Sequence, residues 1–335
     1  MNDIQYQFVK KILNSSSHGA KEIGRAFAPS NIALCKYWGK RDDILNLPYN
    51  GSISISLGEK GTSTEIKRTN KDLFVLNSQI MPRESLFSKR MTSFLDLFRD
   101  SCRAPGFEVI TTNNIPTSAG LASSASGFAA LVLALNDLTG WDLAKKDLSL
   151  LARLGSGSAS RSVYDGFVKW NMGKRDDGFD SYSELIDLRW HELRIGILKV
   201  DESEKKISSR EAMKKCVATS KKYHAWLNQA VDDFHNIHNA IIQKNFSLLG
   251  QIAEANALRM HETIRDTVPS IDFFTKETYE LLEKIRKIRK SGTEVFATID
   301  AGPNIKILFL DKNQSIIDNE FINLEIIKPF GDANA

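Results

Sequence analysis

The sequence lacks the features that mark several large classes of protein. Only three cysteines, Cys35, Cys102 and Cys216, occur among the 335 residues, and none belongs to a C-x-x-C pair. A sparse, odd count is typical of a reducing compartment and argues against a disulfide framework. The chain has no apolar run of about 18 residues, the length that a membrane-spanning helix needs. Residues 1–20 also lack the apolar stretch of a signal peptide. We therefore expect a cytoplasmic protein with no membrane partner.

Concentrated charge of one sign is also missing. Lys and Arg number 45 and Asp and Glu 41, so the net charge is only +4 and is spread over the whole chain. Nucleic-acid binding is typically marked by clustered Lys and Arg. The short basic run 284–290 has helical spacing, which indicates a solvated helix face. We expect no nucleic-acid partner.

The apolar pattern predicts an α+β chain in two domains. A length of 335 residues, 42% of them hydrophobic, is more than one core usually accommodates. We expect a peripheral N-terminal extension at 1–20, a first domain at 21–190 and a second at 191–335. In the first domain we expect strands within 26–57 and at 64–68, 73–77, 107–111 and 163–170, and helices at 83–100, 127–138 and 148–154. In the second we expect helices at about 210–243, 245–261 and 272–290, and strands at 193–200, 294–299 and 305–310.

The most informative stretch is Asn114-Ile-Pro-Thr-Ser-Ala-Gly-Leu-Ala-Ser-Ser-Ala-Ser-Gly127, which joins a predicted strand to an apolar helix. Its small side chains allow a ligand to approach the backbone. Free N–H groups at a helix start, together with the helix dipole, favour an anion. Ser123 and Ser124 add hydroxyls suited to phosphate oxygens or Mg²⁺. The stretch is neither a Walker A loop nor a G-x-G-x-x-G loop. It indicates phosphate binding, with a tightly packed helix start as the alternative.

Two clusters carry cations beside tight turns. Lys36, Lys40 and Arg41 surround a Tyr-Trp-Gly turn that follows an apolar strand. Such cations can pair with phosphates, although a solvated surface hairpin would also contain them. Arg161 lies in the Gly/Ser-rich run 155–162, where a guanidinium has the geometry to grip a carboxylate or phosphate with two hydrogen bonds. A plain linker is the alternative for that run.

Asp300 ends a predicted strand and precedes the turn Ala301-Gly-Pro-Asn304. The Gly-Pro-Asn run forces a sharp turn and fixes the carboxylate at a strand terminus, where catalytic groups are often found. An ordinary turn-starting aspartate is the alternative. The run Gly155-Ser-Gly-Ser-Ala lacks the final glycine of a G-x-S-x-G nucleophile elbow, which argues against a hydrolase of that kind.

Together these motifs resemble those of the diphosphomevalonate decarboxylases of the GHMP kinase superfamily. The matching segments are Lys36–Arg41, Pro116–Ala125, Ser156–Ser162 and Asp300–Asn304, and the similarity runs from about Ala26 to Leu310. Glu254–His261 also looks like the bacterial branch of the family. The resemblance implies a two-domain GHMP kinase fold, with an N-terminal domain like domain 2 of ribosomal protein S5 and a ferredoxin-like α/β C-terminal domain.

The activity that the resemblance implies is ATP-dependent decarboxylation of mevalonate 5-diphosphate to isopentenyl diphosphate, in the mevalonate pathway of isoprenoid biosynthesis. The 3-hydroxyl is phosphorylated first, and phosphate and CO₂ then leave. ATP and Mg²⁺ are the implied cofactors, and a homodimer is the implied assembly. A mevalonate 5-phosphate decarboxylase, a mevalonate 3-kinase and a non-catalytic nucleotide sensor on the same fold are the alternatives.

The resemblance also implies a role for individual residues. Asp300 is the catalytic aspartate near the 3-hydroxyl, and Arg161 faces the carboxylate. The substrate is bound by Tyr37, Trp38, Gly39, Lys40, Ser156, Gly157, Ser158, Ala159, Ser160, Arg161, Ser209 and Arg210. ATP is bound by Pro116, Ser118, Ala119, Gly120, Leu121, Ala122, Ser123 and Ser124, with Ser123 or Ser124 near Mg²⁺.

Charge supports these assignments and also raises a question about the base. Asp300 amid cations should have a lowered pKa, so we expect it to orient the hydroxyl and take its proton late in the transfer. Retention of Asp300 and Arg161 argues against a pure kinase. Lys40, Ser209 and Arg210 favour the 5-diphosphate over the 5-phosphate.

The sequence departs from the family pattern at two positions. Gly51 replaces the usual Ser or Asp, and Ser160 replaces the usual Cys. Neither change removes a charge that the chemistry needs, although Gly51 is expected to loosen a loop near the substrate.

Overall fold

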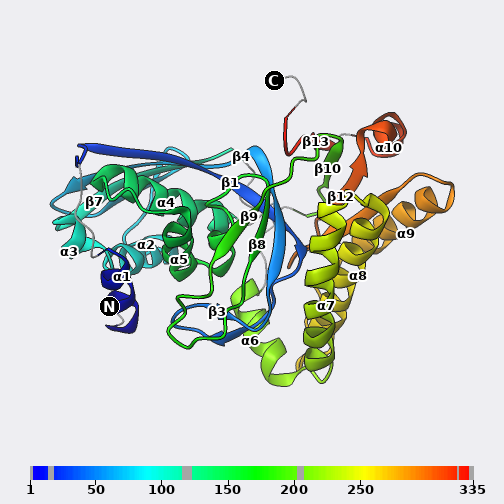
Figure 1. Ribbon diagram of the computed structural model, residues 1–335, viewed down its shortest axis with the longest axis horizontal. Helices are drawn as coiled ribbons and strands as arrows, with labels where there is room; N and C mark the ends of the chain where they lie inside the picture. The colour runs from blue at the N-terminus through cyan, green and yellow to red at the C-terminus, as the bar shows by residue number, and fades with distance from the viewer. Residues whose placement is uncertain (1–2, 14–18, 115–122, 202–206, 323, 332–335) are drawn as a thin grey trace.

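The computed structural model describes residues 3–13, 19–114, 123–201, 207–322 and 324–331 (Figure 1). Within them, the larger sheet has seven strands, in the order β6-β5-β7-β4-β8-β9, with β1 paired to β4. These are β1 (Ile23–Cys35), β4 (Ser52–Thr69), β5 (Leu73–Leu76), β6 (Gln79–Ile80), β7 (Gly106–Asn113), β8 (Phe167–Trp170) and β9 (Ser183–Ile186). The β5–β7 pair is parallel, and the other pairs are antiparallel.

Strand β4 corrects one expectation. The runs 52–57 and 64–68, predicted as separate strands, belong to one strand of 18 residues. The strand continues through Gly58, although its φ is +56°, because β1 pairs along both halves. The long strand therefore links the two ends of the larger sheet.

Helices pack on one face of this sheet. They are α2 (Leu86–Leu95), α3 (Arg99–Cys102), α4 (Ser123–Thr139) and α5 (Lys145–Gly155). Helix α4 packs directly on β1 and β4, so closely that a Cβ at Gly24 would lie 2.2 Å from the carbonyl oxygen of Ala134. The helix predicted at 83–100 is interrupted at residues 96–98, where Leu97 and Phe98 donate to carbonyls three residues back and tighten the chain into turns.

Smaller elements of this half bear on the site. They are the hairpin of β2 (Lys40–Asp42) and β3 (Leu47–Pro48), and the 3₁₀ helix η1 (Gly157–Ser160). Helix α1 (Asp3–Ile12) was expected to be peripheral, and that expectation is wrong. Phe8 and Val9 are buried in the hydrophobic core to which α5 also contributes.

The smaller sheet has the order β11-β12-β10-β13 and is antiparallel throughout. Its strands are β10 (Leu193–Leu198), β11 (Val295–Ile299), β12 (Ile305–Leu310) and β13 (Glu325–Ile327). The helices of this half are α6 (Ser209–Thr219), α7 (Tyr223–Ile242), α8 (Phe246–Arg265), α9 (Lys276–Lys290) and α10 (Gln314–Glu320), with the 3₁₀ helix η2 (Asp311–Asn313) before α10. Helices α8 and α9 pack on β11, and α7 lies beside α8 and against β1 and β4 of the larger sheet (Figure 1).

The single helix predicted at 210–243 is in fact two helices. Helix α6 ends at Thr219 and α7 begins at Tyr223. The carboxylate of Asp266, which follows α8, accepts hydrogen bonds from the Ser220 hydroxyl at 2.9 Å and the Lys222 amide at 3.1 Å. These contacts replace helical hydrogen bonds in the intervening turn, so the break depends on a residue distant in the sequence.

One hydrophobic core is shared by both sheets. Ile32, Ile53 and Phe167 from the larger sheet pack in the same buried cluster as Ile195 and Phe296 from the smaller one. The site described below lies along this junction. Within the described residues, no helix combines the length and the hydropathy needed to cross a bilayer.

Candidate functional site

The carboxylate of Asp300 lies between two buried ammonium groups. It follows β11 directly, and its Oδ1 is 2.8 Å from Lys36 Nζ while its Oδ2 is 3.4 Å from Lys306 Nζ. Lys36 follows β1 and Lys306 lies on β12, so the two sheets together build this group. Burial alone would raise the pKa of Asp300, but Lys36 and then Lys306 outweigh it and hold the pKa well below its usual range. Asp300 is therefore an anion at neutral pH.

The groups around Asp300 are fixed by further hydrogen bonds. The Lys36 side chain is 2% exposed, and its Nζ also donates to the Ala33 carbonyl at 2.8 Å. Burial lowers the pKa of Lys36, partly offset by the charge of Asp300. His261 Nε2 lies 3.1 Å from the Asp300 carbonyl oxygen, which can only accept. Burial lowers the pKa of His261 to about 3, so a neutral imidazole donates this bond and holds the Asp300 backbone.

Arg161 is a second buried charge with fixed geometry. It follows η1 and is 3% exposed. Its Nη1 donates to Ser52 Oγ at 2.5 Å, and its Nη2 and Nε donate to Asn31 Oδ1 at 3.1 and 3.3 Å. The guanidinium also lies 5.9 Å from the centre of the Trp170 ring. Burial lowers the pKa of Arg161 to about 10, so it remains charged at neutral pH. A rigid cation of this kind suits a carboxylate ligand.

The β2–β3 hairpin contributes Lys40. Its Nζ donates to Asn46 Oδ1 at 2.6 Å and lies 3.7 Å from Asp43 Oδ1. Burial, followed by the charge of Arg210, lowers the pKa of Lys40 to about 8. The Asn46 amide in turn donates to two carbonyls at the end of α5, each at 2.9 Å. The position of Lys40 is thus tied to that helix through Asn46.

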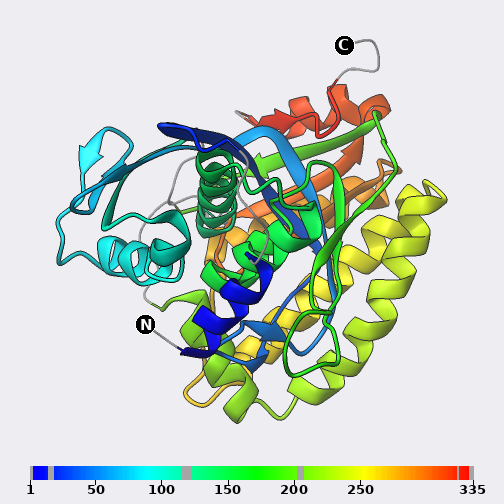
Figure 2. The same ribbon diagram turned by 60° about the vertical axis from the view of Figure 1, so that its left-hand side comes forward.

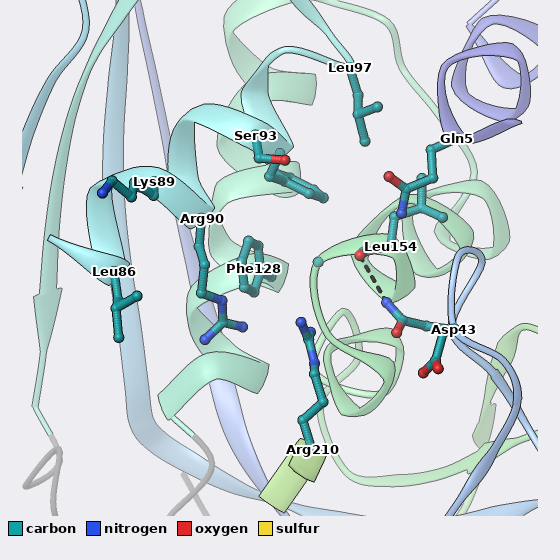
Figure 3. A pocket seen from close by; sticks show the side chains of 13 residues that line it. Gln5, Asp43, Leu86, Lys89, Arg90, Ser93, Leu97, Phe128, Leu154 and Arg210 are labelled. Carbon is teal, nitrogen blue, oxygen red and sulfur yellow. Dashed lines mark hydrogen bonds between the residues drawn. The ribbon is translucent and has the colours of Figure 1, made fainter. Parts of the chain in front are cut away.

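A cavity of about 300 Å³ opens beside the hairpin (Figure 3). In Figure 3, Arg90 from α2 and Arg210 from α6 point toward one another across it. The cavity is lined by Gln5, Asp43, Asn46, Leu86, Lys89, Arg90, Ser93, Phe94, Leu97, Phe128, Leu154, Gly155 and Arg210. The Arg90 guanidinium lies 5.6 Å from the centre of the Phe128 ring, and burial, followed by the charge of Arg210, lowers its pKa. Three cations beside apolar side chains suit a ligand that is anionic at one end.

The η1 segment supplies several of the predicted binding residues. Ser156 Oγ lies 3.3 Å from Ser158 Oγ and 3.5 Å from Ser124 Oγ, so these hydroxyls gather where α4 begins. The structure does not bring the hydroxyl of Ser160 to them. Ser160 is fully buried, donates to the Gly157 carbonyl at 2.9 Å and accepts from a buried serine of β9 at 3.0 Å. The buried methyl group of the intervening Ala159 also lies in the core.

The three residues after Lys36 lie in different surroundings. Tyr37 packs edge-on to Trp170, with ring centres 4.8 Å apart, and among the described residues its buried hydroxyl has no hydrogen-bond partner. A buried hydroxyl without a partner is uncommon in folded proteins, which marks this one as a candidate ligand contact. Trp38 is buried in an apolar cluster instead, where its carbonyl accepts from Tyr223 at 2.9 Å. Gly39 has a φ of +100°, and a Cβ there would lie 1.9 Å from the Tyr223 hydroxyl.

The predicted ATP loop is only partly within the described residues. Pro116, Ser118, Ala119, Gly120, Leu121 and Ala122 lie outside them, as does the side chain of Ser123. Ser124, in the first turn of α4, is exposed. Within the described chain, no group of three or more His, Cys, Asp or Glu residues is arranged to hold a metal. The hydroxyl of Ser124, like phosphate oxygens and water, is an oxygen ligand of the kind that Mg²⁺ accepts.

The structure also shows what the sequence interpretation missed or misjudged. Lys306 beside Asp300, Asn31 beside Arg161 and Arg90 in the cavity were not expected. Of these three, only Lys306 could have been found from the local sequence, because it lies just after the turn that follows Asp300, on the strand that pairs with β11. Gly51 was expected to loosen a loop, but the ring of Phe234 fills the space, 2.9 Å from where a Cβ would stand.

Family models, related sequences and solved structures all match this chain to the same family. Residues 28–183 match the model of the diphosphomevalonate decarboxylase-like N-terminal domain, and residues 195–324 match that of the mevalonate 5-diphosphate decarboxylase C-terminal domain. The diphosphomevalonate decarboxylase of Gibberella zeae is 35% identical over 315 residues, which are 88% of this chain and 82% of that protein.

Solved structures agree with these matches. The mevalonate diphosphate decarboxylase of Staphylococcus aureus has a TM-score of 0.86 and 35% identity, over 92% of this chain and 95% of its own. A complex of MDDEF with MVAPP, AMPPCP and magnesium has a TM-score of 0.83 and 38% identity, over 91% and 95% of the two chains.

Proposed function

The chain belongs to the diphosphomevalonate decarboxylase family, and we propose that Asp300 and Arg161 are its catalytic residues. Membership confirms the predicted α+β GHMP kinase fold. It also confirms the predicted activity, ATP-dependent decarboxylation of mevalonate 5-diphosphate in isoprenoid biosynthesis, with ATP and Mg²⁺ as cofactors. The observation that supports the residue assignment is the position of the Asp300 carboxylate between the buried ammonium groups of Lys36 and Lys306.

Asp300 orients the 3-hydroxyl of the substrate for attack on the γ-phosphate of ATP. Its low pKa makes it a weak base, so the hydroxyl proton passes to it only as the new P–O bond forms. The flanking lysines offset negative charge that gathers as phosphate approaches the carboxylate. Mg²⁺, when bound with ATP, neutralises charge on the phosphates.

Arg161 binds the substrate carboxylate. Its hydrogen bonds to Ser52 and Asn31 hold the guanidinium in one orientation. The carboxylate then loses CO₂, the electron pair of the broken C–C bond forms the double bond, and the 3-phosphate leaves with its oxygen. A fixed cation keeps the carboxylate aligned with the leaving group, which is a positioning effect.

The 5-diphosphate end is bound by Lys40, Arg210, the Tyr37 hydroxyl and the η1 segment. Two observations support this assignment. Lys40 and Arg210 lie near one another at the cavity, and the buried Tyr37 hydroxyl has no hydrogen-bond partner among the described residues. Ser156 and Ser158 face the start of α4, where the predicted ATP loop ends. Ser209 begins α6 directly before Arg210.

We further propose that the enzyme works as a cytoplasmic homodimer. The three cysteines are buried and unbridged, as a reducing compartment would leave them. Light scattering at working concentration tests the assembly, and a mass equal to a single chain would contradict it. The division into domains at residue 190 and the extent of the extension at 1–20 stay predictions.

Stoichiometry tests the assignment of function. Purified protein with Mg-ATP should release equal amounts of ADP and CO₂ from mevalonate 5-diphosphate, and neither from mevalonate 5-phosphate or mevalonate. The Asp300→Asn variant should bind substrate but release no CO₂, whereas Asp318→Asn, on exposed α10, should behave as wild type. Release of ADP without CO₂ would indicate a 3-kinase. Release of neither product from any of the three substrates would indicate a nucleotide sensor.

A further inference from the structure

Helix α1 is firmly docked although it lies before the residues that the family model matches. Phe8 is 4% exposed, and its ring stacks on Phe179 with centres 4.5 Å apart. The buried guanidinium of Arg153, on α5, lies 5.3 Å from the centre of the same ring. Tyr6 adds a hydrogen bond from its hydroxyl to Asp100 Oδ2 at 2.7 Å. These contacts fix both the position and the rotation of the helix.

The docked helix reaches the cavity through Gln5. This side chain lines the cavity opposite Arg90 and Arg210 (Figure 3). Its Nε2 donates to the carbonyl oxygen of Ile44 at 2.6 Å. Ile44 lies in the turn 43–46 between β2 and β3. The helix thus holds the tip of the hairpin that carries Lys40.

Helix α5 holds the same turn from the other side. Arg153 Nε donates to the Leu45 carbonyl at 2.9 Å, and the Asn46 amide donates to the carbonyls of Arg153 and Leu154. Asn46 is in the left-handed region with a φ of +53°, so the turn has a specific conformation that its neighbours maintain. The oxygen of Asn46 accepts from Lys40. Any shift of this turn therefore moves Lys40.

We propose that α1 is a positioning element for substrate binding, in which Gln5 holds the turn 43–46 and thereby places Lys40 at the anionic end of the substrate. The proposal rests on the function proposed above for the identity of that substrate. It gives residues 3–12 a role in binding and none in bond making or breaking.

The test compares the same substitution at two positions of α1 that lie two residues apart. Gln5→Met keeps the length of the side chain but removes the donor to Ile44, whereas Gln7→Met makes the same change at an exposed position of α1. Gln5→Met should raise KM for mevalonate 5-diphosphate about three- to tenfold, as the loss of one hydrogen bond implies, with kcat and KM for ATP changed less than about twofold. Gln7→Met should match wild type.

A second readout separates positioning from general damage. Release of the turn should let water reach Lys40 and return its pKa from about 8 toward its ordinary value. The alkaline limb of kcat/KM should then move to higher pH in Gln5→Met alone. Equal KM values in the two variants, or a loss in kcat with no change in KM, would overturn the proposal.

Binding of inorganic pyrophosphate, followed by calorimetry, keeps this test independent of the reaction. Weaker binding by Gln5→Met than by Gln7→Met supports the positioning role, and equal binding overturns it. If wild type turns over no mevalonate 5-diphosphate, the function proposed above fails, while the pyrophosphate comparison still decides the role of α1.

Discussion

Replacing Lys306 by methionine should make the enzyme sensitive to acid. Lys306 Nζ lies 3.4 Å from Asp300 Oδ2, which corresponds to about 5 kcal/mol of attraction at an effective dielectric constant of about 20. The Asp300 side chain is 27% exposed and keeps its contact with Lys36, so we expect only about a third to a half of this energy to be lost. That loss raises the pKa of Asp300 by about one to two units.

The assay is the pH dependence of kcat/KM. Asp300 must be ionised to orient the hydroxyl, so activity is present above its pKa and is lost as the pH falls through it. The acid limb of Lys306→Met should lie about one to two pH units above that of wild type. Lys312→Met removes a lysine beyond the far end of β12, one that is 63% exposed and pairs with Glu294, and should leave the limb unchanged.

Stability gives the same sign independently of activity. A carboxylate with a lowered pKa stabilises the fold above its unfolded pKa of about 4, and this contribution disappears as the pH falls through the folded pKa. Chemical unfolding of Lys306→Met should therefore lose its pH-dependent component at a higher pH than wild type. If the activity profiles superimpose after scaling and the unfolding curves show the same pH dependence, the electrostatic account of Asp300 is refuted.

Three further results follow from the geometry. Arg161→Lys cannot reproduce the forked contacts, so kcat for CO₂ release should fall about 100-fold, and a fall below tenfold would contradict its role. Gly39→Ala should lower the free energy of unfolding in urea by about 3 kcal/mol, because of its φ of +100° and the contact with Tyr223, whereas Gly127→Ala, within α4 and with open space at its Cβ, should raise it by about 0.5–1 kcal/mol. Lys40 must be protonated to attract the diphosphate, so kcat/KM should decline as the pH rises through about 8, and Lys40→Met should abolish that limb.

Much of the local structure could be predicted from the sequence. The strand at Ile305–Leu310 has the predicted bounds, because a buried apolar run after a Gly-Pro-Asn turn determines it. The break at Ser220 had no such signal, since the carboxylate that stabilises it belongs to Asp266. Local patterns predict elements well, but they do not reveal contacts that another helix supplies.

The same distinction applies to the site. Asp300 and Arg161 could be found from motifs, whose residue types match the chemistry. Lys36 and Asp300 are 264 positions apart, so no spacing rule could pair them. Arg90 resembled any other charged residue on an amphipathic helix, because only packing shows that it faces the cavity.

The core shared by the two sheets also decides how the molecule can come apart. Ile32, Ile53 and Phe167 would be exposed if the segment after residue 190 were removed, because Ile195 and Phe296 cover them. A gene split at that point would encode two fragments, each of which exposes its half of this apolar interface to water. Such fragments should aggregate when made singly and regain activity only when made together, and the intact chain should melt in one calorimetric transition.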